Sequence, residues 1–286
     1  MSGVGIRSLS GPGEHAAKRR SSGGTLLALV GHTVRMQRRS AIIWGVALGL
    51  YSAAMAASFT TFSGNAEEMN QLLKAYPQAL LDAFAIENLA DVENYLNSQV
   101  FLLAPLALAF FPILTAAGAI AGAEERGTID VLLGNPIPRW QLVVGSFAAT
   151  ALSLLVILAI AGLLTWGTAV LMEVDLSLES TAAAVLNMWP VCLFFGGLAM
   201  LCSAFFHRRA LAIAIPAFLL FAMYLVDTIG RASEDLEDLR PASVFYYYGS
   251  AIEDGIDWLN FGGVTLVAFV FILLAVLAFQ RRDIYT

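Results

Sequence analysis

Charged residues are scarce in this sequence of 286 residues. Asp, Glu, Lys and Arg make up 13% of the chain, whereas 58% of its residues are apolar, and a soluble domain carries about 25% charged residues. So few charged residues cannot give a folded chain of this length a polar surface that is compatible with water. The composition therefore excludes an ordinary soluble protein and indicates a chain that lies mostly in lipid. The formal charge of −6 is less informative, because acids and bases occupy separate segments.

Histidine and cysteine are also rare, which excludes several kinds of site. The three histidines, His15, His32 and His207, fall in three separate segments, so they do not form a metal site at ligand spacing. The two cysteines, Cys192 and Cys202, share one apolar run and would lie about 15 Å apart along a helix, too far to bridge each other within it. We therefore expect no metal, and we interpret both cysteines as small apolar helix residues.

The sequence also lacks a phosphate-binding loop, which needs a lysine at the end of a glycine-rich segment. The two lysines, Lys18 and Lys74, follow Ala17 and Leu73. Inside the apolar runs the one ionisable residue is Asp227, near an outer end and without a histidine to pair with, so we interpret it as interfacial. We expect no catalytic residues, no cofactor, no ATP hydrolysis and no nucleic-acid partner for this chain.

Six apolar stretches are long enough to cross a membrane as helices, which takes about 20 residues each. Their cores are expected at residues 41–62, 100–121, 142–171, 183–206, 211–230 and 261–279. Only His207, Arg208 and Arg209 part the fourth from the fifth, which is enough for a tight turn. No cleavable signal precedes the first stretch, so we expect it to remain in the mature protein. The sequence predicts an all-α integral membrane protein with six transmembrane helices.

Basic residues are distributed unevenly between the two sides of these spans. Thirteen of the 16 Lys and Arg residues lie before the first span, between the second and third, between the fourth and fifth, or after the sixth. The remaining connections are rich in acids. Cytoplasmic segments carry the excess of Lys and Arg, so both termini are predicted to be cytoplasmic. Two termini on the same side of the membrane require an even number of spans, which agrees with the six predicted here.

The segments outside the spans have distinct compositions. Residues 1–24 are rich in Gly, Ser and charge, which predicts a disordered cytoplasmic tail. Residues 25–40 combine Leu26, Val30 and Val34 at helical spacing with several arginines, which predicts an amphipathic helix on the inner membrane surface or, equally, a cytoplasmic extension of the first span. The transmembrane domain then covers 41–286. Its outer segments are 63–99, expected to form short amphipathic helices, and 231–259.

The cytoplasmic loop at 123–140 has the features of a short structured element. Gly127 can end the incoming helix, Thr128 can cap a new one, and Pro136 can stop it. That new helix would present an apolar face at the membrane surface, where a partner protein would cover it. The residues of this face are Ile129, Leu132 and Leu133.

This loop resembles the coupling helix of the permease subunits of ABC-2 type transporters. The family pattern is acid, acid, any residue, Gly-Thr, then Leu-Leu, two residues, Pro, a β-branched residue, any residue and Arg. The matching positions are Glu124, Glu125, Gly127, Thr128, Leu132, Leu133, Pro136, Ile137 and Arg139. The resemblance extends to the basic helix before the first span, the long outer segment after it and the stretch at 241–247. The sequence departs from the pattern at Gly134 and Pro138.

The resemblance implies an ATP-driven exporter in which this loop docks on a separate ATPase subunit. The residues it assigns to that contact are Glu124, Glu125, Arg126, Gly127, Thr128, Ile129, Leu132, Leu133, Pro136 and Arg139. It further implies two ATPase copies that bind ATP and Mg²⁺, a second permease subunit forming a homodimer, and a site in the cytoplasmic membrane of a prokaryote among membrane lipids.

The apolar spans suit a hydrophobic or amphipathic substrate, and no substrate-binding residues are predicted. Two other functions are open at this point. One is an ATP-independent secondary transporter or channel, although such proteins usually bury charge in their spans. The other is a membrane assembly protein without transport.

Small and kinking residues suggest how the spans pack. Gly45 and Gly49 in the first span, and Gly118 and Gly122 in the second, have the spacing of close helix contacts. Prolines inside spans can kink their helices and shape a path between them. They are Pro105, Pro112, Pro190 and Pro216.

Overall fold

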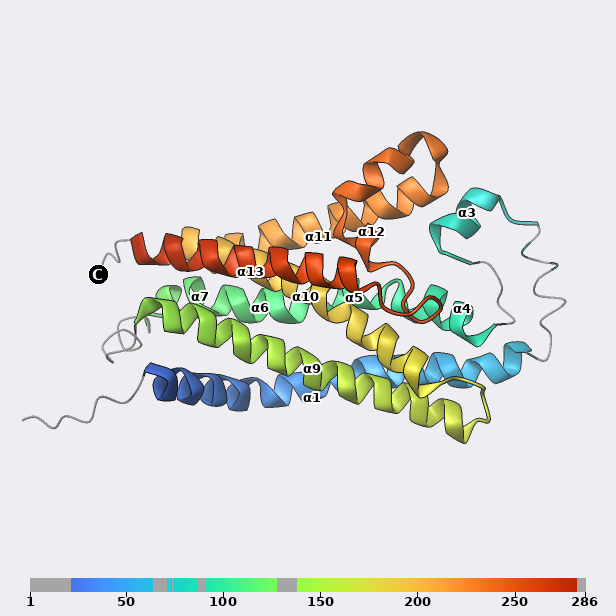
Figure 1. The fold of residues 1–286 in the computed structure, drawn as a ribbon, viewed down its shortest axis with the longest axis horizontal. Coiled ribbons are helices and arrows are strands. Elements are labelled where there is room, and N and C mark those ends of the chain that lie inside the picture. The colour runs from blue at the N-terminus through green and yellow to red at the C-terminus, as the bar shows by residue number, and fades with distance from the viewer. Residues whose placement is uncertain are drawn as a thin grey trace, which may run out of the picture.

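The computed structural model describes residues 22–63, 71, 73, 75–86, 91–127 and 138–281. All the regular elements in these ranges are helices, and the long ones run roughly along the long axis of the molecule (Figure 1). Six of them are long and apolar enough to cross a membrane, at Gly24–Thr61, Val92–Ala119, Arg139–Leu171, Leu178–Phe205, Arg209–Ala232 and Trp258–Arg281. The prediction of an all-α membrane protein with six spans is therefore confirmed.

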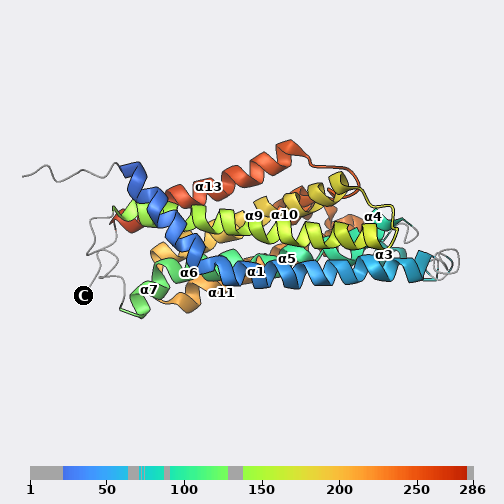
Figure 2. The same cartoon turned by 90° about the horizontal axis from the view of Figure 1, so that it is seen from below.

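The first span belongs to one continuous helix, α1 (Ser22–Ser63), of 42 residues. The helix predicted at 25–40 is thus joined to the span, and Figure 2 shows that it lies at an angle to the rest of α1. Its place on a membrane surface stays a prediction. Residues 1–21, most of the predicted tail, lie outside the described residues.

α1 packs along α9 (Arg139–Leu171) through glycines. A Cβ atom added at Gly45 would lie 3.0 Å from the Cβ of Ile160, and one at Gly49 would lie 2.6 Å from the Cδ1 of Leu164. These positions need glycine because any side chain would push the two helices apart. The predicted close contact at Gly45 and Gly49 is confirmed.

The second glycine pair does not behave in the same way. A Cβ at Gly118 would meet no atom within 4 Å, whereas one at Gly122 would lie 3.0 Å from the Cδ of Arg209. The prediction of a close helix contact through Gly118 is therefore wrong. The spacing of two glycines does not show whether a neighbouring helix packs against both of them.

The second span is a series of short helical segments. They are α4 (Val92–Leu96), the π-helix η1 (Asn97–Phe101), α5 (Ala104–Leu108), α6 (Phe110–Ala119) and α7 (Ala121–Glu125). Pro105 and Pro112 both lie in first turns, of α5 and α6, where a missing N–H costs least. The expected interruptions by proline are therefore present here, and the span also begins earlier than the predicted core.

The fourth span, α10 (Leu178–Phe205), is the centre of the bundle. It contacts α6, α9, α11 (Arg209–Ala232) and α13 (Trp258–Arg281). Most of its apolar part is buried (72%), whereas only 28% of the apolar part of α1 and 22% of that of α11 and of α13 are buried. Cys192 and Cys202 are buried on α10 and not bonded to each other, as expected. The three exposed helices are the faces that lipid or another chain can cover.

The bundle has two distinct ends (Figure 1). At one, here named the N/C end, α1 begins, α13 ends and α7 ends. The turn between α10 and α11 also lies there, at 206–208, one residue earlier than the predicted 207–209. The other is named the η2 end, after the 3₁₀-helix η2 (Glu234–Ala242). It also carries the short helices α3 (Gln78–Ala83) and α12 (Val244–Tyr248), so the outer segments do form short helices where they are described.

Candidate functional site

The predicted coupling loop is described only at its two flanks. Thr128, Ile129, Leu132, Leu133 and Pro136 lie outside the described residues, and their contact with an ATPase stays a prediction. The described members are Glu124, Glu125, Arg126 and Gly127, at the end of α7, and Arg139, at the start of α9. Both flanks lie at the N/C end (Figure 1).

Gly127 terminates the second span in the way the sequence predicts. Its φ of 63° lies in the left-handed region that favours glycine, and its N–H donates to the Glu124 carbonyl at 2.9 Å. Arg126 folds back, with Nη2 donating to the Gly118 carbonyl at 3.4 Å. The chain therefore leaves the helix sharply before the undescribed part of the loop.

The two acids of the loop contact the turn between α10 and α11. A Glu125 Oε1 atom accepts a hydrogen bond of 2.9 Å from the backbone N–H of Arg209, the first residue of α11. A Glu124 Oε1 atom lies 3.7 Å from Nε2 of His207. The Glu125 carboxylate thus caps the positive end of α11, whose own N-cap residue, Arg208, makes no side-chain cap.

The other flank joins α9 to the end of α13. The Arg139 Nη1 donates to the Phe279 carbonyl at 3.1 Å, and the guanidinium lies 5.6 Å from the centre of the Phe279 ring. The loop flanks are therefore connected to α11 and α13, which sequence reasoning missed. A usable signal was the start of α11, where arginine at the N-cap leaves amides that need an acceptor from elsewhere.

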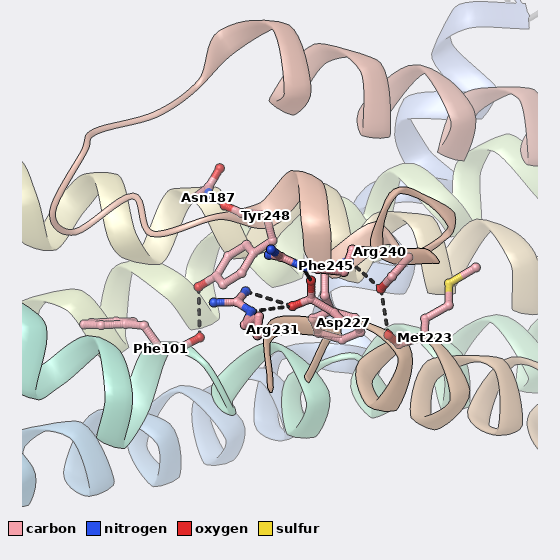
Figure 3. Close-up of polar contacts among 9 residues, drawn as sticks. Phe101, Asn187, Met223, Asp227, Arg231, Arg240, Phe245 and Tyr248 are labelled. Carbon is pink, nitrogen blue, oxygen red and sulfur yellow. Dashed lines mark hydrogen bonds and ion pairs between the residues drawn. The ribbon is translucent and has the colours of Figure 1, made fainter. Parts of the chain in front are cut away.

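A second polar cluster lies at the η2 end (Figure 3). Asp227 of α11 is 2% exposed and binds two arginines. Its Oδ2 lies 2.8 Å from Nη2 of Arg231, and its Oδ1 accepts from Nε of Arg240 at 3.1 Å. Asp227 is thus a buried and paired residue, and sequence reasoning missed both partners. The i, i+4 spacing of Asp227 and Arg231 was a signal for the first of them.

Further buried hydrogen bonds surround that cluster (Figure 3). The Tyr248 hydroxyl donates to the Phe101 carbonyl at 3.0 Å, and the Asn187 Nδ2 donates to the Tyr248 carbonyl at 2.6 Å. The Ser243 hydroxyl donates to the Met223 carbonyl at 2.7 Å. Burial raises the pKa of the Tyr248 phenol above its ordinary value. These contacts fasten η1, α10, α11 and α12 together, which is a structural role.

An apolar groove of about 680 Å³ runs between α9, α10 and α13. Its aromatic and aliphatic lining includes Trp140, Phe147, Leu155, Trp189, Phe269 and Ile272. Such a groove suits an apolar molecule or chain rather than a charged one. Across the part of the chain that the structure describes, no group of three or more His, Cys, Asp or Glu residues could hold a metal ion.

The fold defines a multi-pass α-helical membrane protein whose second span ends and third span begins at the N/C end. The model of a family described as "ABC-2 family transporter protein" matches residues 27–284, so the chain belongs to that family. A similar curated protein is the "Probable ABC transporter permease protein NosY" of Pseudomonas aeruginosa, 38% identical over 98 residues. That match covers 34% of this chain and 32% of the relative, about a third of each.

Proposed function

We propose that this chain is the membrane-spanning permease subunit of an ATP-driven ABC exporter. Two copies form the path for a hydrophobic or amphipathic substrate across the cytoplasmic membrane of a prokaryote. Each copy is coupled to a separate ATPase subunit through the loop at 124–139, and the ATPase binds ATP and Mg²⁺. The observation that carries the proposal is the family match over residues 27–284.

The structure supports the N/C end as the cytoplasmic, motor-facing end. Arginines gather there, as the positive-inside rule requires of the cytoplasmic side. Described examples are Arg126, Arg139, Arg208 and Arg281. The loop emerges between α7 and α9, both of which are joined to other spans by hydrogen bonds. A push on this loop by an ATPase would therefore reach α11 and α13 directly.

The bundle also supports an apolar cargo and a pair of subunits. Asp227 and its two arginines lie at the η2 end, and the long groove between α9, α10 and α13 is apolar. The exposed faces of α1, α11 and α13 leave room for a second permease subunit, as a homodimer of twelve spans requires. The relative described as a probable ABC transporter permease supports the same class of function.

The test is affinity purification of the tagged chain, expressed from its native locus, followed by an ATPase assay. We expect a subunit with a phosphate-binding loop, identified by mass spectrometry, to co-purify and to hydrolyse ATP. The double variant Leu132→Asp, Leu133→Asp should no longer co-purify this ATPase subunit. The matched control, Leu236→Asp, Leu239→Asp, carries the same charges on the exposed side of η2 and should retain it.

A chain that purifies alone and without ATP hydrolysis would contradict the proposal. The ATP-independent transporter or channel would then be the better hypothesis. A co-purifying ATPase whose activity is indifferent to added substrates and to reconstitution in lipid would instead favour an assembly protein without transport.

A further inference from the structure

The second span breaks between α6 and α7 without a proline at the break. Ile120 separates the two helices, with φ −115° and ψ −71°, away from regular helical values. Pro112 lies in the first turn of α6, far from this point. Sharp helix breaks otherwise arise where a side chain or water enters the ladder of backbone hydrogen bonds, so the surroundings of Ile120 must supply the cause.

A buried serine from another helix enters the ladder at this point. In a continuous helix the amide of Ala121 would donate to the carbonyl of Ala117. Here the Ala121 N–H donates to the Ser203 Oγ at 3.0 Å, and that hydroxyl donates to the Ala117 carbonyl at 3.4 Å. Ser203 belongs to α10 and is fully buried. Its hydroxyl thus stands between the two groups that a regular helix would join.

α7 contacts the two helices that flank the α10–α11 turn as well as α6. A Cβ at Gly122 would lie 3.0 Å from the Cδ of Arg209, so the backbone of α7 lies against the side chain of the first residue of α11. The hydrogen bond from the Arg209 N–H to Glu125 holds the other end of α7 to the same place. Ser203 lies on the final turn of α10 that leads into this turn.

We propose that Ser203 is a positioning residue that makes the α6–α7 junction a hinge. α7 then moves with the α10–α11 turn as one unit, and a displacement of the coupling loop passes into α10 and α11 instead of along α6. This inference rests on the proposed function for the source of the displacement. The hinge geometry itself rests only on the contacts of Ser203, Ala117 and Ala121.

The hinge is tested first in the purified chain, without an ATPase. Spin labels are placed on cysteines introduced at Arg126 and Arg208, both exposed at the N/C end. In Ser203→Ala the helix can close its own bond between Ala117 and Ala121, so α6 and α7 should straighten. We expect a longer or broader distance distribution between the labels. The control Ser98→Ala, a buried serine that bonds the Tyr95 carbonyl of its own span, should leave the distribution unchanged.

A double variant separates a hinge from simple packing. Proline at 121 has no N–H to donate and is tolerated in a first helical turn, so Ser203→Ala, Ala121→Pro should restore the break and the wild-type label distance. The proposal is overturned if Ser203→Ala leaves the distance distribution unaltered. It is also overturned if the double variant stays shifted, because Ser203 would then act through packing alone.

The second readout uses the complex with its ATPase. Ser203→Ala should still co-purify the ATPase, and its rate of ATP hydrolysis should fall by about 2- to 30-fold, the range that mutations between coupled sites produce. Wild-type rates in a complex that still forms would overturn the hinge while leaving the proposed function intact. If no ATPase co-purifies even with the wild type, the proposed function fails and the label distances still decide the hinge.

Discussion

The two ends of the bundle are held together by different kinds of contact. At the η2 end, buried side chains of α10, α11 and α12 are joined by charge-assisted and buried hydrogen bonds, with Asp227 at their centre. At the N/C end, Ser203 makes buried hydrogen bonds, but the contacts of Glu125 and His207 that hold the coupling-loop flank to α11 are exposed. Buried charged contacts are costly to break, whereas exposed ones contribute little. The comparison indicates one end that is fixed and one that can adjust.

The largest effect is expected from Asp227→Asn. The substitution leaves Arg231 and Arg240 without their shared carboxylate, and removing one partner of a buried ion pair costs about 3–5 kcal/mol. We expect a large fall in the thermal midpoint of the purified chain in detergent. The control Glu237→Gln changes an exposed acid of η2 and should stay within about 0.5 kcal/mol. Equal stability of the two variants would remove the contrast between the ends.

A second effect concerns the α1–α9 contact that runs between the two ends. Gly49→Ala places a methyl group 2.6 Å from Leu164 Cδ1 and 3.1 Å from Ala161 Cα, so we expect a loss of about 1–3 kcal/mol. Gly31→Ala, on the same helix, meets nothing within 4 Å and should be neutral or stabilising, by up to about 1 kcal/mol. The unfolding midpoints of the two variants, measured in detergent, check this prediction. The packing account fails if both variants shift stability equally.

Tyr248 makes the η2 end sensitive to alkali. Its pKa is raised by burial, so the folded chain keeps the phenol proton where an unfolded chain, with a pKa of about 10, loses it. Stability from this group is complete below about pH 10 and declines as the pH rises further. Tyr248→Phe should be about 0.5–1.5 kcal/mol less stable at neutral pH, because the Phe101 carbonyl loses its donor, and should decline less steeply in alkali.

The matched control for that titration is Tyr76→Phe, since Tyr76 is 59% exposed. It should follow the wild type in denaturation experiments from about pH 9 to about pH 11. An alkaline decline that is identical in wild type and Tyr248→Phe would mean that Tyr248 does not contribute to it.

The smallest effect is expected from Glu124→Gln at the N/C end. The His207 side chain is 59% exposed and its Nε2 lies 3.7 Å from Glu124, and exposed polar contacts of this kind contribute about 0–1 kcal/mol. We expect an unfolding midpoint close to that of the wild type at neutral pH. A loss as large as that of Asp227→Asn would show that the N/C end is as rigidly held as the η2 end.

The sequence was sufficient to locate the six spans, because a segment that crosses the bilayer has few alternatives to a helix of about 20 apolar residues. Contacts between spans were harder to predict. Gly45–Gly49 and Gly118–Gly122 share the same spacing, yet both glycines of the first pair have a helix packed against them, whereas Gly118 of the second pair has none among the described helices. The spacing of small residues describes one face of one helix, whereas a close helix contact also depends on which other helix packs against that face.

The polar contacts show the same limit at single residues. Arg231 follows Asp227 by one helical turn and was within reach of sequence reasoning, but Arg240 comes from η2, after the helix has ended. The break at Ile120 was not predictable at all, because no breaking residue lies there. Its cause, Ser203, lies on α10, 82 residues beyond Ala121 in the chain.

The most direct test of the proposed function is site-specific photocrosslinking in native membranes. A photoreactive amino acid at Leu133 is compared with one at Leu239, which is 55% exposed on η2 at the opposite end. The proposal predicts an adduct with an ATPase subunit, identified by its phosphate-binding loop peptide, from position 133 and none from 239. The absence of that adduct from position 133, or its formation from both positions, would contradict an ATPase docked on the loop at the N/C end.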